Sequence, residues 1–269
     1  MIPLVLLDLD GTIIGSSGQV QDCVWQAAER VRAAGVKLAV CTGRPLGGVA
    51  QRVAERLGPN LPHIFQSGAL IAYPDGRTLQ VSALKEAHAR RLIAHARELG
   101  LVLELYSPNA LYIERKTPMS EAHAKLIGVS AIVRELYDVA ENEPIIRAQW
   151  VVPEDRLGEV LALELKGSQV SVAGSPALKH TAFASITQAG VSKGSAATFL
   201  ARQLKLKPEN VMAVGDSAGD LPMLEAVGHP VVMAGASDAL RGRYEVVAGD
   251  VERCGVVGAL EAALKIATV

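Results

Sequence analysis

Two carboxylates stand close together near the start of the chain, where an apolar run ends. Asp8 and Asp10 are separated by Leu9, and Gly11 and Thr12 follow them directly. Two carboxylates about 4 Å apart repel each other by ~4 kcal/mol at an effective dielectric constant of about 20. A cation must offset that repulsion, or one of the groups must hold a proton. The pair therefore indicates either a solvated acidic turn or a site that holds a metal ion and acts on phosphorus.

Two further apolar runs end in residues that could serve the same chemistry. Thr42, Gly43 and Arg44 follow the run VKLAVC. Asp216 follows the run NVMAVG, and Asp220 lies just beyond it. Short, continuous apolar runs are typical of parallel strands that are buried on both faces. Ligands of an open parallel sheet bind beyond the carboxyl ends of its strands. The three strand ends are therefore expected to meet at one place.

The side chains at these strand ends offer oxygen ligands, which select a hard cation. Mg²⁺ fits, because it typically takes one or two carboxylates and completes its shell with water and substrate phosphate. A calcium-binding EF-hand loop is excluded, since its sixth and twelfth positions would be Ile13 and Gln19 instead of Gly and Glu. Zinc is disfavoured because the six histidines show no ligand spacing such as HExxH.

Helical patterns alternate with the apolar runs and define the fold class. Apolar residues recur at helical spacing in four segments, 21–34, 47–57, 195–206 and 256–267. Strands and helices of these lengths in alternation predict an α/β protein with a doubly wound, Rossmann-like parallel sheet.

The middle of the chain carries a second set of elements. The stretch from Pro45 to Ser192 is far longer than a loop. After the helix expected over 47–57 come the short strands HIFQS and LIAYP, and a less regular stretch covers 118–142. The other expected elements are helices over 84–99 and 153–166 and strands near 101–106, 110–114, 145–152, 168–173 and 180–187. We therefore predict a core domain of residues 1–81 and 187–269 and an inserted, smaller α/β domain of residues 82–186.

Composition and charge narrow the class of protein. The chain is 49% hydrophobic and 20% charged, as in ordinary soluble globular proteins. Its formal net charge of −1 and the lack of a Lys/Arg block argue against a nucleic acid or membrane partner. The first apolar run is too short and lacks the basic flank of a signal peptide. Cys23, Cys41 and Cys254 are few and far apart, so we expect reduced thiols in a cytoplasmic protein.

Four polar segments resemble the motifs of the haloacid dehalogenase superfamily of aspartate-nucleophile phosphatases. DLDGT is similar to the first motif, CTGR to the second, VSKG with its Lys193 to the third, and GDSAGD to the fourth. The insertion between the second and third motifs resembles the type IIB cap of the Cof-type subfamily. The order and spacing of the motifs cover nearly the whole chain.

The resemblance implies catalytic roles for three residues. Asp8 would be the nucleophile and form an aspartyl-phosphate, which splits one difficult step into two easier ones. Asp10 would protonate the leaving alcohol and then deprotonate the attacking water, a proton transfer worth ~10²–10⁴-fold. Lys193 would neutralise charge on the transferring group and restrain Asp8.

The resemblance also implies a metal site and a phosphate site. Mg²⁺ would be held by the Asp8 carboxylate, the Asp10 backbone carbonyl and the Asp216 carboxylate, with Asp220 supporting them. The residues expected at the phosphoryl group are Thr42, the amide of Gly43, Arg44 and Lys193.

The chain departs from the family pattern at three positions. Gly219 replaces the asparagine of GDxxND, so one hydrogen bond to phosphate or to a metal-bound water is lost unless Ser217 replaces it. Ser67 stands for the asparagine of the NGA loop, and Ser185 for an acidic residue. None of these changes touches the nucleophile, the acid/base or the lysine.

The expected function is Mg²⁺-dependent hydrolysis of a small phosphate monoester, such as a sugar phosphate. A phosphomutase or phosphotransferase on the same scaffold is the first alternative. A non-catalytic module that binds a phosphate ligand is the second, and the changes at Gly219 and Ser67 are the reason to include it. Candidate specificity positions in the insertion are Arg115, Lys116, Arg147 and Lys179. The oligomeric state is left open.

Overall fold

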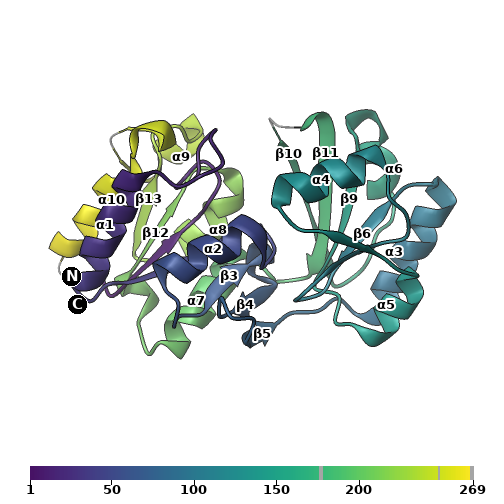
Figure 1. Ribbon diagram of the computed structural model, residues 1–269, viewed down its shortest axis with the longest axis horizontal. Helices are drawn as coiled ribbons and strands as arrows, with labels where there is room; N and C mark the ends of the chain where they lie inside the picture. The colour runs from purple at the N-terminus through teal and green to yellow at the C-terminus, as the bar shows by residue number, and fades with distance from the viewer. Residues whose placement is uncertain (176–177, 248, 267–269) are drawn as a thin grey trace. The chain divides into compact units, whose positions relative to one another are not determined.

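The computed structural model describes residues 1–175, 178–247 and 249–266 (Figure 1). The chain divides into two compact units. Unit 1 comprises Met1–Arg44, Ala50–Leu79 and Ser192–Val269, and unit 2 comprises Pro45–Val49 and Gln80–Val191. The assignment of residues 82–186 as a cap domain stays a prediction.

Unit 1 is built on a five-stranded parallel sheet in the order β14-β13-β12-β1-β2. Its strands are β1 (Leu4–Leu7), β2 (Lys37–Val40), β12 (Val211–Gly215), β13 (His229–Val232) and β14 (Glu245–Val246). The register sets Leu7 beside both Val40 and Val214. The residues that follow these three positions consequently leave the sheet at the same level. The predicted class, a doubly wound α/β sheet, is confirmed.

Helices cover both faces of this sheet. On one face, α1 (Asp22–Ala33) and α10 (Val256–Lys265) pack together and against β2 and β12 (Figure 1). On the other face, α7 (Lys193–Gln203) and α8 (Leu221–Glu225) bury Leu200 and Met223 in an apolar cluster with Leu4 and Leu6. The remaining elements are α2 (Gly48–Leu57), β3 (His63–Phe65), η1 (Gln66–Gly68), β4 (Leu70–Ala72), β5 (Thr78–Val81), η3 (Pro208–Asn210), η4 (Ala218–Asp220), α9 (Asp238–Arg241) and η5 (Val251–Arg253). Of these, α2 and β5 each have two residues in unit 2.

Unit 2 contains a six-stranded sheet in the order β10-β11-β9-β6-β7-β8. Its strands are β6 (Leu103–Tyr106), β7 (Leu111–Ile113), β8 (Ala131–Val133), β9 (Arg147–Pro153), β10 (Ser168–Ser175) and β11 (Leu178–Gln188). Helices α3 (Glu86–Leu99), α5 (Leu136–Asn142) and α6 (Leu157–Leu161) pack on its apolar face, where Trp150 is fully buried. In the described part of the chain, no helix is long and apolar enough to span a membrane.

The opposite face of the unit 2 sheet carries a buried polar network under α4 (Pro118–Ile127). Glu104 accepts hydrogen bonds from the Tyr106 hydroxyl, at 2.8 Å, and from Gln149 Nε2, at 3.3 Å. Its carboxylate also lies 2.9 Å from His123 Nδ1 of α4. Because buried polar groups are costly unless they are paired, this network fixes α4 to the sheet.

Two element predictions in unit 2 are wrong. Residues 118–142 are not irregular, since they form α4, β8 and α5; α4 begins with a capping box of Thr117 and Ser120 and ends at the left-handed Gly128. The helix expected over 153–166 is reduced to η2 (Glu154–Arg156) and α6. Beyond α6, Leu163 and Leu165 both pack against the apolar cluster, and a spacing of two residues places side chains on one face only in extended chain.

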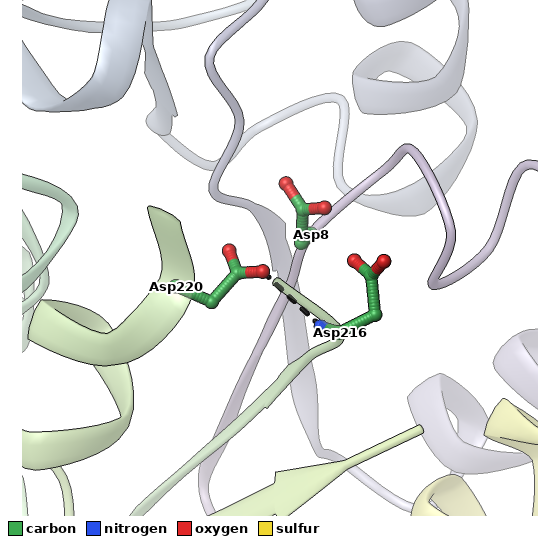
Figure 2. Close-up of side chains that lie close together, drawn as sticks. All are labelled: Asp8, Asp216 and Asp220. Atoms are coloured by element: carbon green, nitrogen blue, oxygen red, sulfur yellow. Dashed lines mark hydrogen bonds between the residues drawn. The ribbon is translucent and has the colours of Figure 1, made fainter. Parts of the chain in front are cut away.

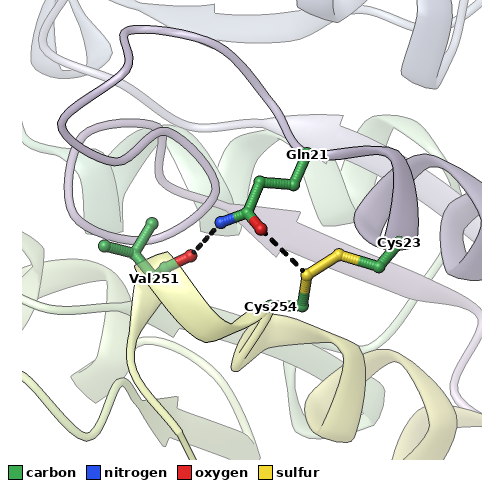
Figure 3. Close-up of a disulfide and its surroundings, with 4 residues drawn as sticks. All are labelled: Gln21, Cys23, Val251 and Cys254. Atoms are coloured by element: carbon green, nitrogen blue, oxygen red, sulfur yellow. Dashed lines mark hydrogen bonds between the residues drawn. A yellow bond between two sulfur atoms is a disulfide. The ribbon is translucent and has the colours of Figure 1, made fainter.

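The expectation of three reduced thiols is wrong for two of the cysteines. Cys23, in the first turn of α1, and Cys254, just before α10, form a disulfide with a Cα–Cα distance of 6.3 Å (Figure 3). Beside it, Gln21 Nε2 donates a hydrogen bond to the Val251 carbonyl at 2.8 Å. Cys41 is a buried free thiol. A separation of 231 residues hides this pairing from the sequence, because it arises only when α1 and α10 pack together.

Reduction of this disulfide is expected to destabilise unit 1. Loss of a native disulfide that closes a long loop typically costs about 2–5 kcal/mol of the free energy of unfolding, which corresponds to a fall in Tm of about 5–15 °C. Thermal unfolding with and without dithiothreitol measures the effect. The Cys23→Ser/Cys254→Ser double variant is the control, because its Tm should not respond to the reductant. Equal Tm values for the oxidised and reduced wild-type protein would contradict this prediction.

Candidate active site

Three carboxylates gather at the carboxyl edge of the unit 1 sheet. Asp8 follows β1, Asp216 follows β12 and Asp220 ends η4, and one carboxylate oxygen of each lies within 4.8 Å of the others (Figure 2). The Asp8 amide donates to the Val214 carbonyl at 3.0 Å, which continues the β1–β12 ladder one residue past the strand. The parallel register therefore brings together residues that lie more than 200 positions apart in the sequence.

A buried lysine links two of these carboxylates. Lys193 Nζ donates to Asp8 Oδ1 at 2.5 Å and to Asp220 Oδ1 at 2.6 Å, and its side chain is only 7% exposed. Lys193 is the first residue of α7, whose N-cap Ser192 forms a capping box with Ser195. A Cβ atom at the next position, Gly194, would lie 2.1 Å from the Pro222 carbonyl oxygen, so glycine is needed for this close approach.

The electrostatics of the site favour a bound cation. With all four groups ionised, the three carboxylates and Lys193 carry a net charge of −3 + 1 = −2. Burial first, and then repulsion from Asp220, raise the pKa of Asp8 well above its ordinary value, although Lys193 acts in the opposite direction. The same two causes raise the pKa of Asp216 to about 6. Burial lowers the pKa of Lys193, but Asp8 and Asp220 outweigh it and hold the pKa above its ordinary value. A divalent cation would offset the excess negative charge.

Asp220 organises the loop that carries Asp216. Its Oδ2 atom accepts hydrogen bonds from the amides of Asp216, at 3.1 Å, and Ser217, at 3.0 Å, and from the Ser217 hydroxyl at 3.0 Å. Its Oδ1 atom is the acceptor of Lys193, and the residue is fully buried. Both oxygens are thus engaged by protein donors, which suits a supporting role better than direct metal ligation.

Replacement of Asp220 by alanine is expected to cost about 3–5 kcal/mol of the free energy of unfolding, because it removes at once one acceptor of the buried Lys193 and the acceptor of the three donors of Asp216 and Ser217. Chemical denaturation of the variant measures this loss. Asp238→Ala is the matched control, since the Asp238 side chain is 93% exposed and its ion pair lies on the surface; its stability should change by about 0.5 kcal/mol or less. Similar stability of the two variants would contradict the role assigned to Asp220.

The loop after β2 brings the second set of predicted residues to the same edge. The fully buried Thr42 donates its amide to the Ile64 carbonyl at 2.9 Å and accepts the Ser67 amide at 3.0 Å through its own carbonyl. Its hydroxyl oxygen accepts the Arg44 amide at 3.1 Å. A Cβ atom at Gly43 would lie 3.3 Å from Ser67 Oγ, so the backbone at Gly43 passes close to the loop that contains Ser67. Ser67 itself has a backbone conformation in the left-handed region. Thr42 is thereby fixed at its position in the loop.

Two of the predicted site residues form an ion pair with each other. The Arg44 guanidinium donates two hydrogen bonds to the Asp10 carboxylate, from Nε at 2.7 Å and from Nη2 at 2.6 Å. The family resemblance implies separate roles for Asp10 and Arg44, at the leaving group and at the phosphoryl group, and no feature of the sequence indicates that they pair.

Sequence reasoning named Gly11 and Thr12 but gave them no role at the site. Gly11 has a φ of +79°, and a Cβ atom there would lie 2.2 Å from Asp216 Oδ2, so only glycine fits between the two loops. Thr12 Oγ1 donates to Asp216 Oδ1 at 3.4 Å. Gly219, in contrast, has room for a side chain, since its Cβ atom would make an ordinary contact with Ser217 Oγ at 3.5 Å. The loss of asparagine at 219 is therefore not imposed by packing.

The fold and the site define a class of enzyme, and the comparison with known proteins identifies its family. A family model described as haloacid dehalogenase-like hydrolase matches residues 5–260. The chain belongs to this family. The resemblance to Cof-type haloacid dehalogenase proteins is thus confirmed, as is the predicted enzyme class, a phosphatase.

Two relatives named as phosphatases match this chain over most of their length. The chain is 27% identical to the Bacillus subtilis protein named putative phosphatase YxeH, with 88% of each chain covered. It is 26% identical to the Escherichia coli protein named pyridoxal phosphate phosphatase YbhA, with 92% of this chain and 93% of the relative covered. The solved structure described as HAD subclass IIB sugar phosphatase BT4131 superimposes with a TM-score of 0.80, covers 96% of this chain and 98% of that one, and is 20% identical. That last likeness shows a shared fold.

Proposed function

We propose that this protein hydrolyses a small phosphate monoester, with Mg²⁺ as cofactor, through an aspartyl-phosphate on Asp8. The observation that carries the proposal is the meeting of Asp8, Asp216, Asp220 and Lys193 at one sheet edge, where their net charge of −2 would attract a divalent cation. The Asp8 and Asp216 carboxylates and the Asp10 carbonyl would hold the ion. When bound, Mg²⁺ neutralises charge on the phosphoryl oxygens and favours the ionised form of Asp8.

The first half of the reaction transfers the phosphoryl group. A carboxylate oxygen of Asp8 forms a bond to phosphorus as the bond from phosphorus to the alcohol oxygen breaks. Asp10 gives its proton to that oxygen, and the alcohol leaves. Lys193 and Thr42 stabilise the charge on the phosphoryl oxygens, since phosphoryl transfer depends mainly on positioning and electrostatic stabilisation.

The second half regenerates the enzyme. Water attacks phosphorus and gives a proton to Asp10, while the bond from phosphorus to the Asp8 oxygen breaks, so inorganic phosphate leaves and Asp8 returns to its carboxylate form. We propose that residues 82–186, the predicted type IIB cap, select the leaving group. Among the charged positions named above as specificity candidates in this segment, Arg147 is buried and lies over the Tyr106 ring, with its guanidinium carbon 4.2 Å from the ring centroid, whereas Arg115 donates to the Gly100 carbonyl.

A panel of phosphate monoesters tests this function. The wild-type protein and the Asp8→Asn variant are incubated with Mg²⁺ and sugar phosphates, pyridoxal phosphate or other small monoesters, and released phosphate is measured. We expect release by the wild-type protein alone. Isomerised sugar phosphate without phosphate release would identify a mutase instead. Ligand binding without turnover of any substrate would identify a binding module.

A further inference from the structure

Arg44 and Asp10 form a two-point contact within unit 1. Arg44 Nε donates to Asp10 Oδ2 and Arg44 Nη2 to Asp10 Oδ1, at 2.7 and 2.6 Å, so each carboxylate oxygen has its own donor. Such fork-to-fork pairs fix the direction of a carboxylate as well as its position, because the guanidinium is planar and its donors are rigidly spaced. A lysine in place of Arg44 could not reproduce this geometry.

Arg44 is the rigid member of the pair. Its amide donates to Thr42 Oγ1 at 3.1 Å, and its carbonyl accepts the Gln66 amide at 3.0 Å. The Arg44 side chain is 16% exposed, whereas that of Asp10 is 57% exposed. An exposed aspartate has several rotamers of similar energy, and fixing one of them requires a partner that is itself held in place.

We propose that Arg44 is a positioning residue that holds the Asp10 carboxylate in its working orientation, and is not primarily a ligand of the phosphoryl group. This inference rests on the proposed function, in which Asp10 exchanges a proton with the leaving oxygen and with water. Its physical basis is that each Asp10 oxygen accepts one hydrogen bond from the rigid fork and keeps its second lone pair for the exchanged proton. A proton transfer of this kind requires heavy atoms within about 2.6–3.2 Å of each other, so a carboxylate that rotates freely loses most of its benefit.

The two roles for Arg44 predict different dependence on the leaving group. A phosphoryl ligand contributes equally whatever alcohol leaves. A residue that acts through Asp10 matters most for alkyl phosphates, whose leaving oxygen needs a proton, and little for p-nitrophenyl phosphate, whose leaving group departs as a stable anion. For Arg44→Gln we therefore expect kcat/KM to fall at least about tenfold more with an alkyl phosphate than with p-nitrophenyl phosphate. This difference is part of the ~10²–10⁴-fold rate increase that a positioned proton transfer provides.

A double-mutant cycle tests the inference directly. Single-turnover release of p-nitrophenol and of an alkyl alcohol is measured for the wild-type protein, Arg44→Gln, Asp10→Asn and the double variant. If Arg44 acts through Asp10, the extra loss with the alkyl substrate is absent when Arg44→Gln is made in the Asp10→Asn protein, because coupled residues are not additive. Losses that are equal for the two substrates and multiply in the double variant would overturn the proposal and make Arg44 a phosphoryl ligand.

Two control variants distinguish loss of the Arg44 fork from loss of a positive charge or of any other arginine. Arg44→Lys keeps the charge but not the fork, so its kcat/KM should show nearly the same extra loss with the alkyl substrate as that of Arg44→Gln. Absence of this extra loss in Arg44→Lys would overturn the proposal. Arg77→Gln removes an exposed arginine that pairs with Asp75 on the surface, and it should match the wild-type protein. A wild-type protein that is inactive on both substrates would instead refute the proposed function, and Tm values report whether each variant is folded.

Discussion

Asp8→Asn is expected to remove phosphatase activity while the fold is retained. The amide cannot form the aspartyl-phosphate, and loss of the nucleophile in an enzyme with a covalent intermediate costs about 10⁴–10⁶-fold in kcat. Asp8 is buried and its pKa is raised by burial and by Asp220, so a neutral side chain of the same shape relieves repulsion there. Lys193 still has Asp220 as a partner. The Tm should therefore stay equal to that of the wild-type protein or rise.

Phosphate release and thermal unfolding of the same preparations check both parts of this prediction. Asp155→Asn, at an exposed position in η2, is the matched control and should keep full activity and stability. An Asp8→Asn protein that is folded and retains more than about a tenth of the wild-type kcat would exclude Asp8 as nucleophile.

Removal of divalent cations is expected to cause the second largest loss of phosphatase activity. Without a cation, the carboxylates of Asp8, Asp216 and Asp220 repel one another and the phosphoryl oxygens lose their neutralising charge. Activity should be lost after treatment with EDTA and return with Mg²⁺. Asp216→Asn should need at least about 100-fold more Mg²⁺ for half-maximal activity, since even residues that only support a metal ligand contribute about 10–100-fold.

Calorimetric titration with Mg²⁺ and activity assays over a range of Mg²⁺ concentrations measure these effects. Gly219→Ala is the control, because the position has room for a methyl group and carries no ligand atom. Full activity of the wild-type protein in EDTA, after exhaustive dialysis, would contradict a role for the ion.

The pH dependence of cation binding follows from the raised pKa of Asp216. A proton and the cation compete for this carboxylate, so Mg²⁺ affinity should be constant above the pKa of about 6 and fall as the pH decreases below it. In the metal-free protein, folding stability is expected to change with pH in the opposite direction. The folded state keeps its proton to higher pH than the unfolded state, whose pKa is near 3.8, so stability decreases as pH rises through this window. Mg²⁺ should restore it, which Tm measurements at several pH values would show; a metal-free Tm that increases from about pH 4 to about pH 6 would contradict the assignment.

The fold class could be predicted because the buried strands of the core are recognisable in the sequence as short apolar runs. The uninterrupted apolar runs before Asp8 and Asp216 match β1 and β12, and strand ends in one parallel sheet must lie at one edge. The same reasoning failed where structure depends on distant partners. The helix α4 is fixed to its sheet by the Glu104–His123 contact, and Leu163 and Leu165 are held extended by a core that no local pattern reveals.

The site shows the same division between local and distant information. The clustering of Asp8 with Asp216 was expected from strand geometry alone, whereas the place of Lys193 came from the resemblance to a family. A lysine at the start of a helix is usually solvated, and only the assembled fold shows that this one is buried between two carboxylates. The Arg44–Asp10 fork and the Cys23–Cys254 disulfide had no sequence signal, because each depends on the conformation of loops between elements.

Chemical trapping of the phosphorylated enzyme is the most direct test of the central claim, that a phosphoryl group passes onto Asp8. The protein is mixed with substrate and Mg²⁺, quenched within one turnover and treated with borohydride, which reduces an acyl phosphate to an alcohol. Peptide mass spectrometry should then find homoserine at position 8, and only when both substrate and Mg²⁺ were present. Rapid phosphate release with no modification of Asp8, or with modification of another residue, would contradict the mechanism.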